Sequence, residues 1–292
     1  MSKNEIEISG DISRLVNKTN ERIIEIADKF LKNSLIYEPT MHFLKAPGKL
    51  IRPALVLTSA IILGKEPKKY IDLAASIEFL HTASLIHDDI IDKDEKRRGI
   101  ETVQKKYGID GAILAGDMLF ALAVNTASAY GREVLEITSK AAADMCIGEF
   151  LDSGAQKNRQ VLSLDEYLNI AKLKTASLIS SATSVVAVYE KDEYKNKILK
   201  DFGINIGMSF QIRDDILNYL KRDKLKDSTS DINNFRPNIV AVYNNLNSSI
   251  SPVKAAIEKN NEYIQKAKES LKKLEDSSYL LPYVNFLKVE ED

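Results

Sequence analysis

The feature that most restricts the fold of this chain is the lack of proline between Pro67 and Pro237. Proline removes a backbone hydrogen-bond donor and clashes with the preceding helical turn, so a long segment without it can be helical throughout. The 292 residues include only 12 glycines and 7 prolines, whereas turn-rich sheets use both freely. The sequence therefore predicts an all-α fold.

Apolar residues recur at helical spacing along most of the chain, beginning with Ile12, Val16 and Ile23 in residues 12–33. Residues 68–92 are apolar on nearly every face, which predicts a helix at the centre of the fold. The other predicted helices span 111–130, 133–153, 164–189, 194–222 and 253–275, with loops near 228–238 and 244–251. No repeat or linker divides them, so we predict one domain over residues 1–292.

The balance of charges limits the classes of partner. The chain has 41 basic and 42 acidic residues, so no overall field attracts nucleic acid or an anionic membrane. Cys146 is the only cysteine, which excludes an intrachain disulfide or a cysteine-based zinc site and indicates a cytoplasmic setting. The N-terminus does not resemble a signal peptide, and no stretch of about eighteen uncharged apolar residues predicts a membrane span.

Two aspartate clusters lie beside apolar helical segments. Asp88 and Asp92 are four residues apart, so in a helix they project from one face, about 5–6 Å from each other. Two unit charges about 4 Å apart repel by about 1 kcal/mol in water and by about 4 kcal/mol at an effective dielectric near 20. A partly buried pair therefore needs cations, and oxygen ligands suit Mg²⁺ bound together with phosphates. Asp214 offers a similar face on a distant helix.

Either cluster alone could equally be a solvated helix end, but two such clusters favour a metal site. Basic residues follow the first cluster in Lys96-Arg97-Arg98-Gly99, and others lie upstream in Gly48-Lys49-Leu50-Ile51-Arg52-Pro53. Arginine forks and lysine ammonium groups suit phosphate oxygens, although each cluster alone could be ordinary surface charge. His81 lies seven residues before Asp88 and so faces a similar side, or else is a core histidine. The three histidines form no HExxH zinc motif.

Together these motifs resemble the trans-prenyltransferase (polyprenyl diphosphate synthase) family, including its geranylgeranyl diphosphate synthases. GKLIRP resembles the family's GKxxRP motif, and HDDIIDKDEKRRGIET resembles its first aspartate-rich motif, DDxxD, with the trailing RRGxxT. Gly116-Asp117 resembles the GD motif, Lys174-Thr175 matches the KT pair, and FQIRDDILN resembles the second aspartate-rich motif. The motifs keep the family order from residue 47 to about residue 240.

The resemblance implies an all-α helical bundle around a deep central cavity, usually in a homodimer. It implies head-to-tail, all-trans condensation of isopentenyl diphosphate with an allylic diphosphate. Mg²⁺ would be bound by Asp88, Asp92 and Asp214, with Asp89 and Asp215 as supporting acids. The residues implied to contact the allylic substrate are Arg97, Lys174, Thr175 and Gln211. Those implied to hold isopentenyl diphosphate are Gly48, Lys49, Arg52, His81 and Arg98.

In the implied mechanism, charge on the leaving diphosphate is stabilised, the allylic C–O bond breaks, and Thr175 helps to stabilise the carbocation. The isopentenyl double bond then attacks, and the released diphosphate accepts the proton. The residues implied to be catalytic are Asp88, Asp92, Lys174, Thr175 and Asp214. A terpene cyclase would use the same ionisation, but GKLIRP with His81 indicates an isopentenyl site.

The chain departs from the family pattern after the second motif. Asn218 replaces the last aspartate, and the usual GKP lysine is missing, with Lys226 and Arg236 as the nearest substitutes. These departures leave open a non-catalytic or partner-dependent subunit. Ala83 and Ser84, which precede Asp88 by five and four residues, are small, so we expect a product of geranylgeranyl length or longer.

Overall fold

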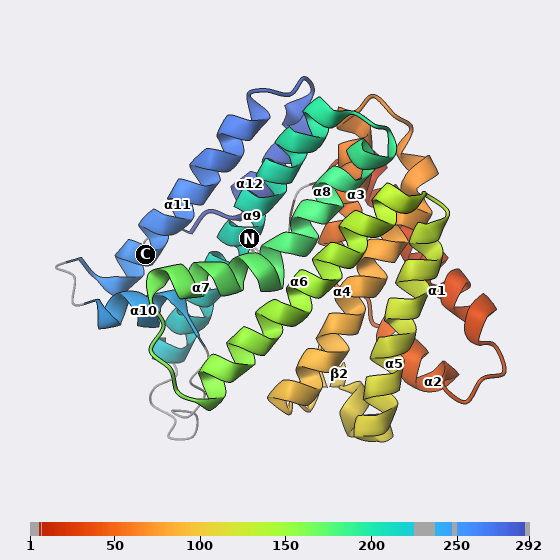
Figure 1. Cartoon of the computed structure of the whole chain (residues 1–292), viewed down its shortest axis with the longest axis horizontal. Coiled ribbons are helices and arrows are strands. Elements are labelled where there is room, and N and C mark those ends of the chain that lie inside the picture. Colours follow the sequence, from red (N-terminus) through yellow and green to blue (C-terminus); the bar gives the residue numbers. More distant parts are fainter. Residues whose placement is uncertain (1–5, 7, 225–236, 247–249, 290–292) are drawn as a thin grey trace. The chain divides into compact units, whose positions relative to one another are not determined.

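The computed structural model describes residue 6 and residues 8–224, 237–246 and 250–289, which are almost entirely helical (Figure 1). Within these ranges the strands are the two-residue pair β1 (Lys96–Arg97) and β2 (Ile100–Glu101). The predicted all-α class is therefore confirmed. The substitutes Lys226 and Arg236 and most of the predicted loop at 228–238 lie outside the described residues.

The chain divides into two compact units. The N-terminal unit comprises Ile8–Ala142 and Ser181–Lys197, and the C-terminal unit comprises Met1–Glu7, Ala143–Ser180 and Ile198–Asp292. Helices α6 (Arg132–Lys157), α8 (Ser177–Tyr189) and α9 (Glu193–Lys224) each have residues in both units. The single domain over residues 1–292 stays a prediction, and each unit is described by itself.

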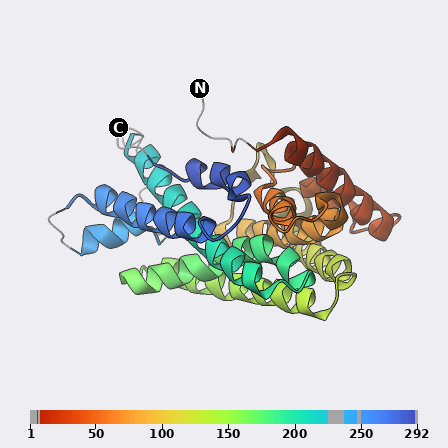
Figure 2. The same cartoon turned by 90° about the horizontal axis from the view of Figure 1, so that it is seen from above.

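The N-terminal unit is built around α4 (Ile71–Asp92), which packs against α1 (Gly10–Leu31), α3 (Ile51–Ile62) and α5 (Val103–Ser128). Helix α2 (Tyr37–Leu44) packs on α5, and the 3₁₀ turn η1 (Pro67–Tyr70) leads into α4. Leu73, Ile77 and Phe79 of α4 are completely buried. The central helix predicted from residues 68–92 is therefore confirmed, and Figures 1 and 2 both show α4 beside α5.

A tight hairpin returns the chain to the end of α4. Lys93 has a left-handed conformation that ends the helix, and Arg98 and Gly99 have positive φ angles of 53° and 81°. Two such residues between antiparallel strands form the kind of turn that matches strand twist. Arg97 pairs with Ile100 across the hairpin. The hairpin therefore places Arg97 and Arg98 next to the helix that carries Asp88.

The C-terminal unit contains α7 (Leu164–Ala171), the π-helical turn η2 (Lys172–Ala176), α10 (Ile239–Asn245), α11 (Pro252–Leu271), η3 (Ser277–Leu280) and α12 (Leu281–Phe286). Its core includes Tyr167, Ile212, Ile216 and Val240. Figures 1 and 2 show α10 beside α11, in agreement with their contacts. The predicted helix at 164–189 is interrupted at the π-turn, which begins two residues before Lys174.

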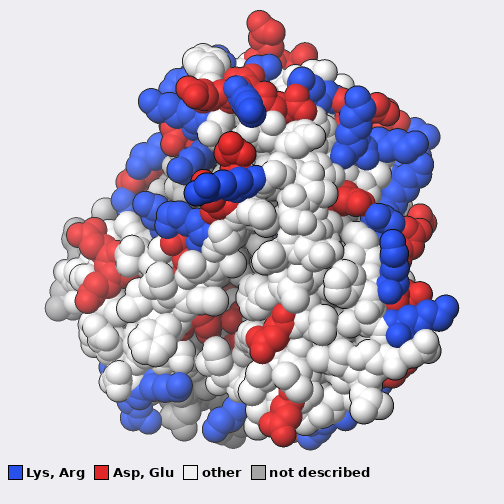
Figure 3. Space-filling view, turned by 45° about the vertical axis from the view of Figure 1, so that its right-hand side comes forward, with Lys and Arg blue, Asp and Glu red and all other residues white. Residues whose placement is uncertain are grey.

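On the face drawn in Figure 3, basic and acidic side chains are interspersed and neither sign dominates. Among the described residues, α5 is the one helix that is long and apolar enough to cross a membrane by length and composition. This differs from the sequence prediction of no span, which required an uncharged stretch, whereas α5 contains Asp110 and Asp117. The criterion is weak evidence for a span, because core helices of soluble proteins also meet it.

Candidate functional site

The first aspartate cluster lies at the C-terminal end of α4. Asp88 and Asp92 are half-buried in the last turns of the helix, which ends at Asp92. A helix C-terminus carries partial negative charge, so it adds to the field of the two carboxylates. This end of α4 is therefore suited to a cation.

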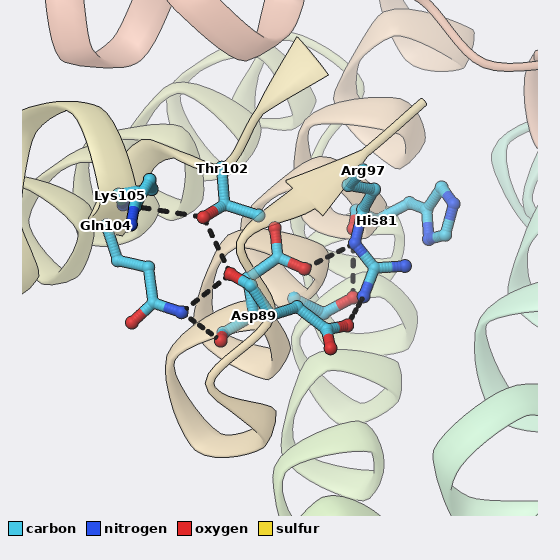
Figure 4. A network of polar contacts seen from close by, with 8 residues as sticks. His81, Asp89, Arg97, Thr102, Gln104 and Lys105 are labelled. Atoms are coloured by element: carbon cyan, nitrogen blue, oxygen red, sulfur yellow. Dashed lines mark hydrogen bonds and ion pairs between the residues drawn. The ribbon is translucent and has the colours of Figure 1, made fainter. Parts of the chain in front are cut away.

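The side chain of Asp89 points toward Arg97 and joins α4 to the hairpin (Figure 4). Its side chain is 1% exposed, and the guanidinium of Arg97 donates a hydrogen bond to Oδ1. Arg97 also lies 3.2 Å from Asp94, and Gln104 Nε2 donates to the backbone oxygens of Asp89 and Asp94 over 2.5 and 2.9 Å. Thr102 Oγ1 donates to the Asp94 oxygen over 2.8 Å. Burial raises the pKa of Asp89, while Arg97 opposes that rise.

This network gives Asp89 a structural task and orients Arg97. Because a buried carboxylate is stable only with a partner, the pair fixes the guanidinium close to the end of α4. The role of supporting acid expected for Asp89 stays a prediction. The expected contact of Arg97 with the allylic substrate stays a prediction.

Arg98 is held by three neighbours from the segment before α3. Its Nη1 donates to the Ala46 oxygen over 3.0 Å, and its guanidinium lies 4.9 Å from the Phe43 ring centroid. A Cβ on Gly48 would lie 2.6 Å from Arg98 Nη2, so only glycine lets the guanidinium approach this backbone. Gly48 and Arg98, both expected in the isopentenyl site, are therefore in contact.

The imidazole of His81 belongs to the same region of the N-terminal unit (Figure 4). Burial, with the positive charges of Arg52, Arg98 and Arg97, holds the pKa of His81 well below its usual value. A neutral imidazole can donate one hydrogen bond and accept another. Arg52 is half-buried near the start of α3, and Lys49 is exposed just before that helix.

Lys174 lies in the π-turn of the C-terminal unit between two carboxylates from α6. Its Nζ is 2.6 Å from Glu149 Oε2 and 2.5 Å from Asp152 Oδ2. All three side chains are between 13% and 26% exposed, so this triad is largely shielded from water. Glu149 and Asp152 were not predicted from the sequence. Their spacing of three residues on a predicted helix was the available signal, since such residues share a face.

Two glycines bring the neighbouring helices close to the π-turn. A Cβ on Gly148 of α6 would collide with the backbone of Lys174, and a Cβ on Gly207 of α9 would lie 2.5 Å from Ala176 Cα. A π-turn widens the backbone of a helix, and such turns are frequent at functional sites. The close packing of α6 and α9 therefore fixes the position of the Lys174-Thr175 pair.

Thr175 is linked to the second aspartate-rich motif by hydrogen bonds. Its Oγ1 donates to Gln211 Oε1 over 2.7 Å, and Gln211 Nε2 donates to Asp215 Oδ1 over 2.9 Å. Asp215 Oδ2 accepts from the Tyr167 hydroxyl at 2.8 Å and from the Ile239 backbone N–H at 3.1 Å. Burial raises the pKa of Asp215 to about 6 despite these donors.

This chain of contacts orients the Thr175 hydroxyl. Because Asp215 accepts from the Gln211 amide nitrogen, the amide oxygen is turned toward Thr175. The hydroxyl hydrogen is directed at that oxygen, which leaves the oxygen lone pairs of Thr175 facing other directions. These contacts bury Asp215 beneath Gln211, and the supporting role expected for it stays a prediction.

Asp214 is half-buried on α9, and its Oδ1 lies 3.8 Å from Arg213 Nη1. Arg213 is buried, with its guanidinium 4.3 Å from the centroid of the Phe286 ring. Asn218, which departs from the family motif, is exposed one turn after Asp214. The substitution therefore removes a charge from an exposed position and leaves the buried network of Asp215 unchanged.

Within the described part of the chain, no group of three or more His, Cys, Asp or Glu side chains could by itself hold a metal ion. Asp88 and Asp92 belong to the N-terminal unit, and Asp214 to the C-terminal unit. The donor chemistry nevertheless fits Mg²⁺, which prefers oxygen and is usually bound by one or two carboxylates together with substrate phosphates and water. The three aspartates stay a prediction as ligands.

Comparisons with known proteins agree on one family. The profile of the polyprenyl synthetase family matches residues 33–274. A geranylgeranyl pyrophosphate synthase from Geoglobus acetivorans is 34% identical over 321 residues, which cover 98% of this chain and 99% of that protein.

Solved structures give the same result. A geranylgeranyl pyrophosphate synthetase from Pyrococcus horikoshii has a TM-score of 0.85 at 28% identity, covering 96% of this chain and 98% of that one. A heptaprenyl diphosphate synthase from Staphylococcus aureus has a TM-score of 0.83 at 28% identity, covering 94% and 97%. The names of these relatives therefore span products of different lengths.

Proposed function

This chain belongs to the polyprenyl synthetase family, and we propose that it is a Mg²⁺-dependent, all-trans polyprenyl diphosphate synthase. It joins isopentenyl diphosphate head-to-tail to an allylic diphosphate. The proposal is supported by the arrangement of side chains in the N-terminal unit. There the end of α4, with two half-buried aspartates, lies beside arginines held by hydrogen bonds and a neutral histidine. Such a set of residues suits a magnesium diphosphate.

In the N-terminal unit, Asp88 and Asp92 would hold Mg²⁺. When bound, Mg²⁺ supplies positive charge that stabilises a leaving diphosphate. Arg97, oriented by Asp89, would contact the allylic diphosphate. The isopentenyl diphosphate would be held by Gly48, Lys49, Arg52, His81 and Arg98.

In the C-terminal unit, Asp214 would hold Mg²⁺, and Lys174 and Gln211 would contact the allylic diphosphate. Lys174 supplies an ammonium group that is largely shielded from water between Glu149 and Asp152. The hydroxyl oxygen of Thr175, whose hydrogen is directed at Gln211, presents lone pairs that stabilise positive charge on the allylic carbon. Positioned dipoles of this kind need no reorganisation during the reaction.

We infer that the product is of geranylgeranyl length or longer. Ala83 is completely buried, so it is part of the core and is a poor candidate for a wall of the chain pocket. Ser84 is half-buried, and its Oγ donates to the His81 backbone oxygen over 2.9 Å. Ser84 is therefore the better of the two small residues for testing product length.

The direct test is to incubate the purified protein alone with Mg²⁺, isopentenyl diphosphate and allylic primers of several lengths, and to separate the products by chromatography. The proposal expects elongated all-trans diphosphates. Product that forms only after a second protein is added would instead support the partner-dependent subunit. Cyclic hydrocarbons without consumption of isopentenyl diphosphate would support a cyclase.

We also propose that the protein is a cytoplasmic homodimer. Ile109, Leu114 and Val124 on α5 are between 52% and 56% exposed, although the helix is apolar. An exposed apolar helix of this kind gains stability when a second copy covers it. Sedimentation of the wild-type protein should give a dimer, and Ile109→Lys should shift it toward monomer. Cys146, the single cysteine of the sequence, is an exposed thiol, which suits a reducing compartment.

A further inference from the structure

A buried glutamate lies among the residues expected to hold isopentenyl diphosphate. Glu78 is on α4, three residues before His81, and is only 3% exposed. Its Oε2 has no hydrogen-bond partner. Buried glutamates are rare unless they are paired, because water is lost from the charge without full compensation. Neither the mechanism nor the family resemblance assigns this side chain a task.

Two guanidinium groups from different elements act on Glu78. Arg52 comes from α3, and Arg98 comes from the turn between β1 and β2. Arg98 directs its Nη1 to the Ala46 oxygen and lies over the Phe43 ring, so it is held by these neighbours. His81, the titratable neighbour on the same helix, is kept neutral. Among the described residues, these arginines are the charged groups that influence Glu78.

Opposing effects set the charge of Glu78. Burial raises its pKa to about 7, and the positive charges of Arg52 and Arg98 keep it from rising further. In the empty site, the carboxylate in turn offsets the repulsion between two neighbouring guanidiniums. A diphosphate bound to the same arginines would cancel their field at Glu78 and add negative charge, so the ionised carboxylate would become unfavourable.

We propose that Glu78 is a positioning residue for isopentenyl diphosphate, whose carboxylate balances Arg52 and Arg98 in the empty site and takes up a proton when the diphosphate binds. The proton comes from the solvent, and no covalent bond changes. The inference rests on the proposed function, since it requires the diphosphate to bind these two arginines.

The proton is counted by isothermal titration of isopentenyl diphosphate into the whole protein without allylic substrate. Repeating the titration at pH 7.5 in buffers of different ionisation enthalpy gives the number of protons taken up. Wild type should take up more than Glu78→Gln, by a sizeable fraction of one proton. Protons from the ligand itself cancel in this difference. Glu78→Asp, which keeps a titratable group, should retain the uptake.

A steady-state measurement separates this role from a merely structural one. The KM for isopentenyl diphosphate in wild type should rise above pH 7, by up to roughly tenfold for each pH unit. In Glu78→Gln the rise should disappear, while the KM for the allylic substrate follows the same pH profile in both proteins. If Glu78→Gln does not fold, difference infrared spectra of wild type should show a protonated carboxyl band appearing when isopentenyl diphosphate is added.

Equal proton uptake in wild type and folded Glu78→Gln would overturn the inference and leave the proposed function intact. So would an infrared difference spectrum of wild type without a carboxyl band at saturating ligand. If isopentenyl diphosphate neither binds to wild type nor enters a product, the proposed function itself fails, and the inference fails with it.

Discussion

A methyl group added at Gly148 tests how closely α6 must approach the π-turn that carries Lys174 and Thr175. The Cβ of an alanine there would lie 2.8 Å from Lys174 Cα and 2.9 Å from the Leu173 carbonyl carbon, and closer still to the Lys174 nitrogen. Ordinary contacts begin at 3.4 Å. These atoms belong to the backbone, so the helix and the turn must separate by at least about 0.5 Å.

Gly154 supplies the matched control. It is on the same helix, six residues later, and a Cβ there would meet nothing within 4 Å. Gly154→Ala should raise the free energy of unfolding by about 0.5–1 kcal/mol, because alanine is the better helix former. Gly148→Ala gains the same helix propensity but is overpacked, which typically costs about 1–3 kcal/mol. The difference between the two variants should therefore be about 1–3 kcal/mol.

Urea unfolding measures this difference, and steady-state kinetics measures the effect on the site. Moving Lys174 and Thr175 by a fraction of an ångström should lower kcat/KM for the allylic substrate by up to about 100-fold in Gly148→Ala. Gly154→Ala should keep wild-type kinetics. A Gly148→Ala protein as stable and as active as Gly154→Ala would refute the packing argument.

Three other predictions follow from the described contacts. Lys174→Met leaves Glu149 and Asp152 without their shared cation, so the free energy of unfolding measured in urea at neutral pH should fall by about 1–3 kcal/mol. Turnover should fall at least about 100-fold, and turnover at the wild-type rate would contradict this. Ser84→Phe should shorten the product seen by chromatography, and an unchanged product would show that other residues close the pocket. The raised pKa of Glu78 means that the folded protein binds a proton more tightly than the unfolded chain, so the free energy of unfolding of wild type should fall as pH rises from about 5 to 7. In thermal or urea unfolding, this fall relative to Glu78→Gln should be at most about 1.4 kcal/mol for each pH unit.

Helices with a clear period or a strongly apolar sequence could be predicted. The central helix at residues 68–92 and the helix at 12–33 match α4 and α1 to within a few residues. The all-α class followed because prolines are confined to the two ends of the chain. Helix α3 was not predicted, because Ile51–Ile62 is only 12 residues long and has Pro53 near its start.

The hairpin and the π-turn could not be predicted from local pattern. Strands of two residues are too short to show alternation, and their pairing depends on positive φ at Arg98 and Gly99. The sequence KLKTA continues the helical pattern on both sides, so the widened turn becomes visible only through the packing of Gly148 and Gly207.

The residues of the candidate site also divide into those that could be predicted from the sequence and those that could not. Aspartates, arginines and the Lys174-Thr175 pair were found because they occur in motifs. Partners that meet them only in the folded chain were missed. Glu149 and Asp152 contact Lys174 across more than twenty residues of sequence, and the isolated Glu78 looks like a polar interruption of an apolar helix. Spacing can show that two residues share a helix face, but which distant residue they meet depends on tertiary packing.

The central claim is that carboxylates of both aspartate-rich motifs act through Mg²⁺ to release diphosphate. It is tested most directly by the Mg²⁺ dependence of diphosphate release at saturating substrates, in wild type, Asp88→Asn and Asp214→Asn, each checked for a wild-type unfolding transition. We expect no turnover after chelation of Mg²⁺. Each variant should need a higher Mg²⁺ concentration and should release diphosphate at least about 100-fold more slowly. Removing one group that stabilises charge in the transition state typically has an effect of this size. A folded Asp88→Asn or Asp214→Asn protein with the wild-type rate and the wild-type Mg²⁺ dependence would contradict the claim.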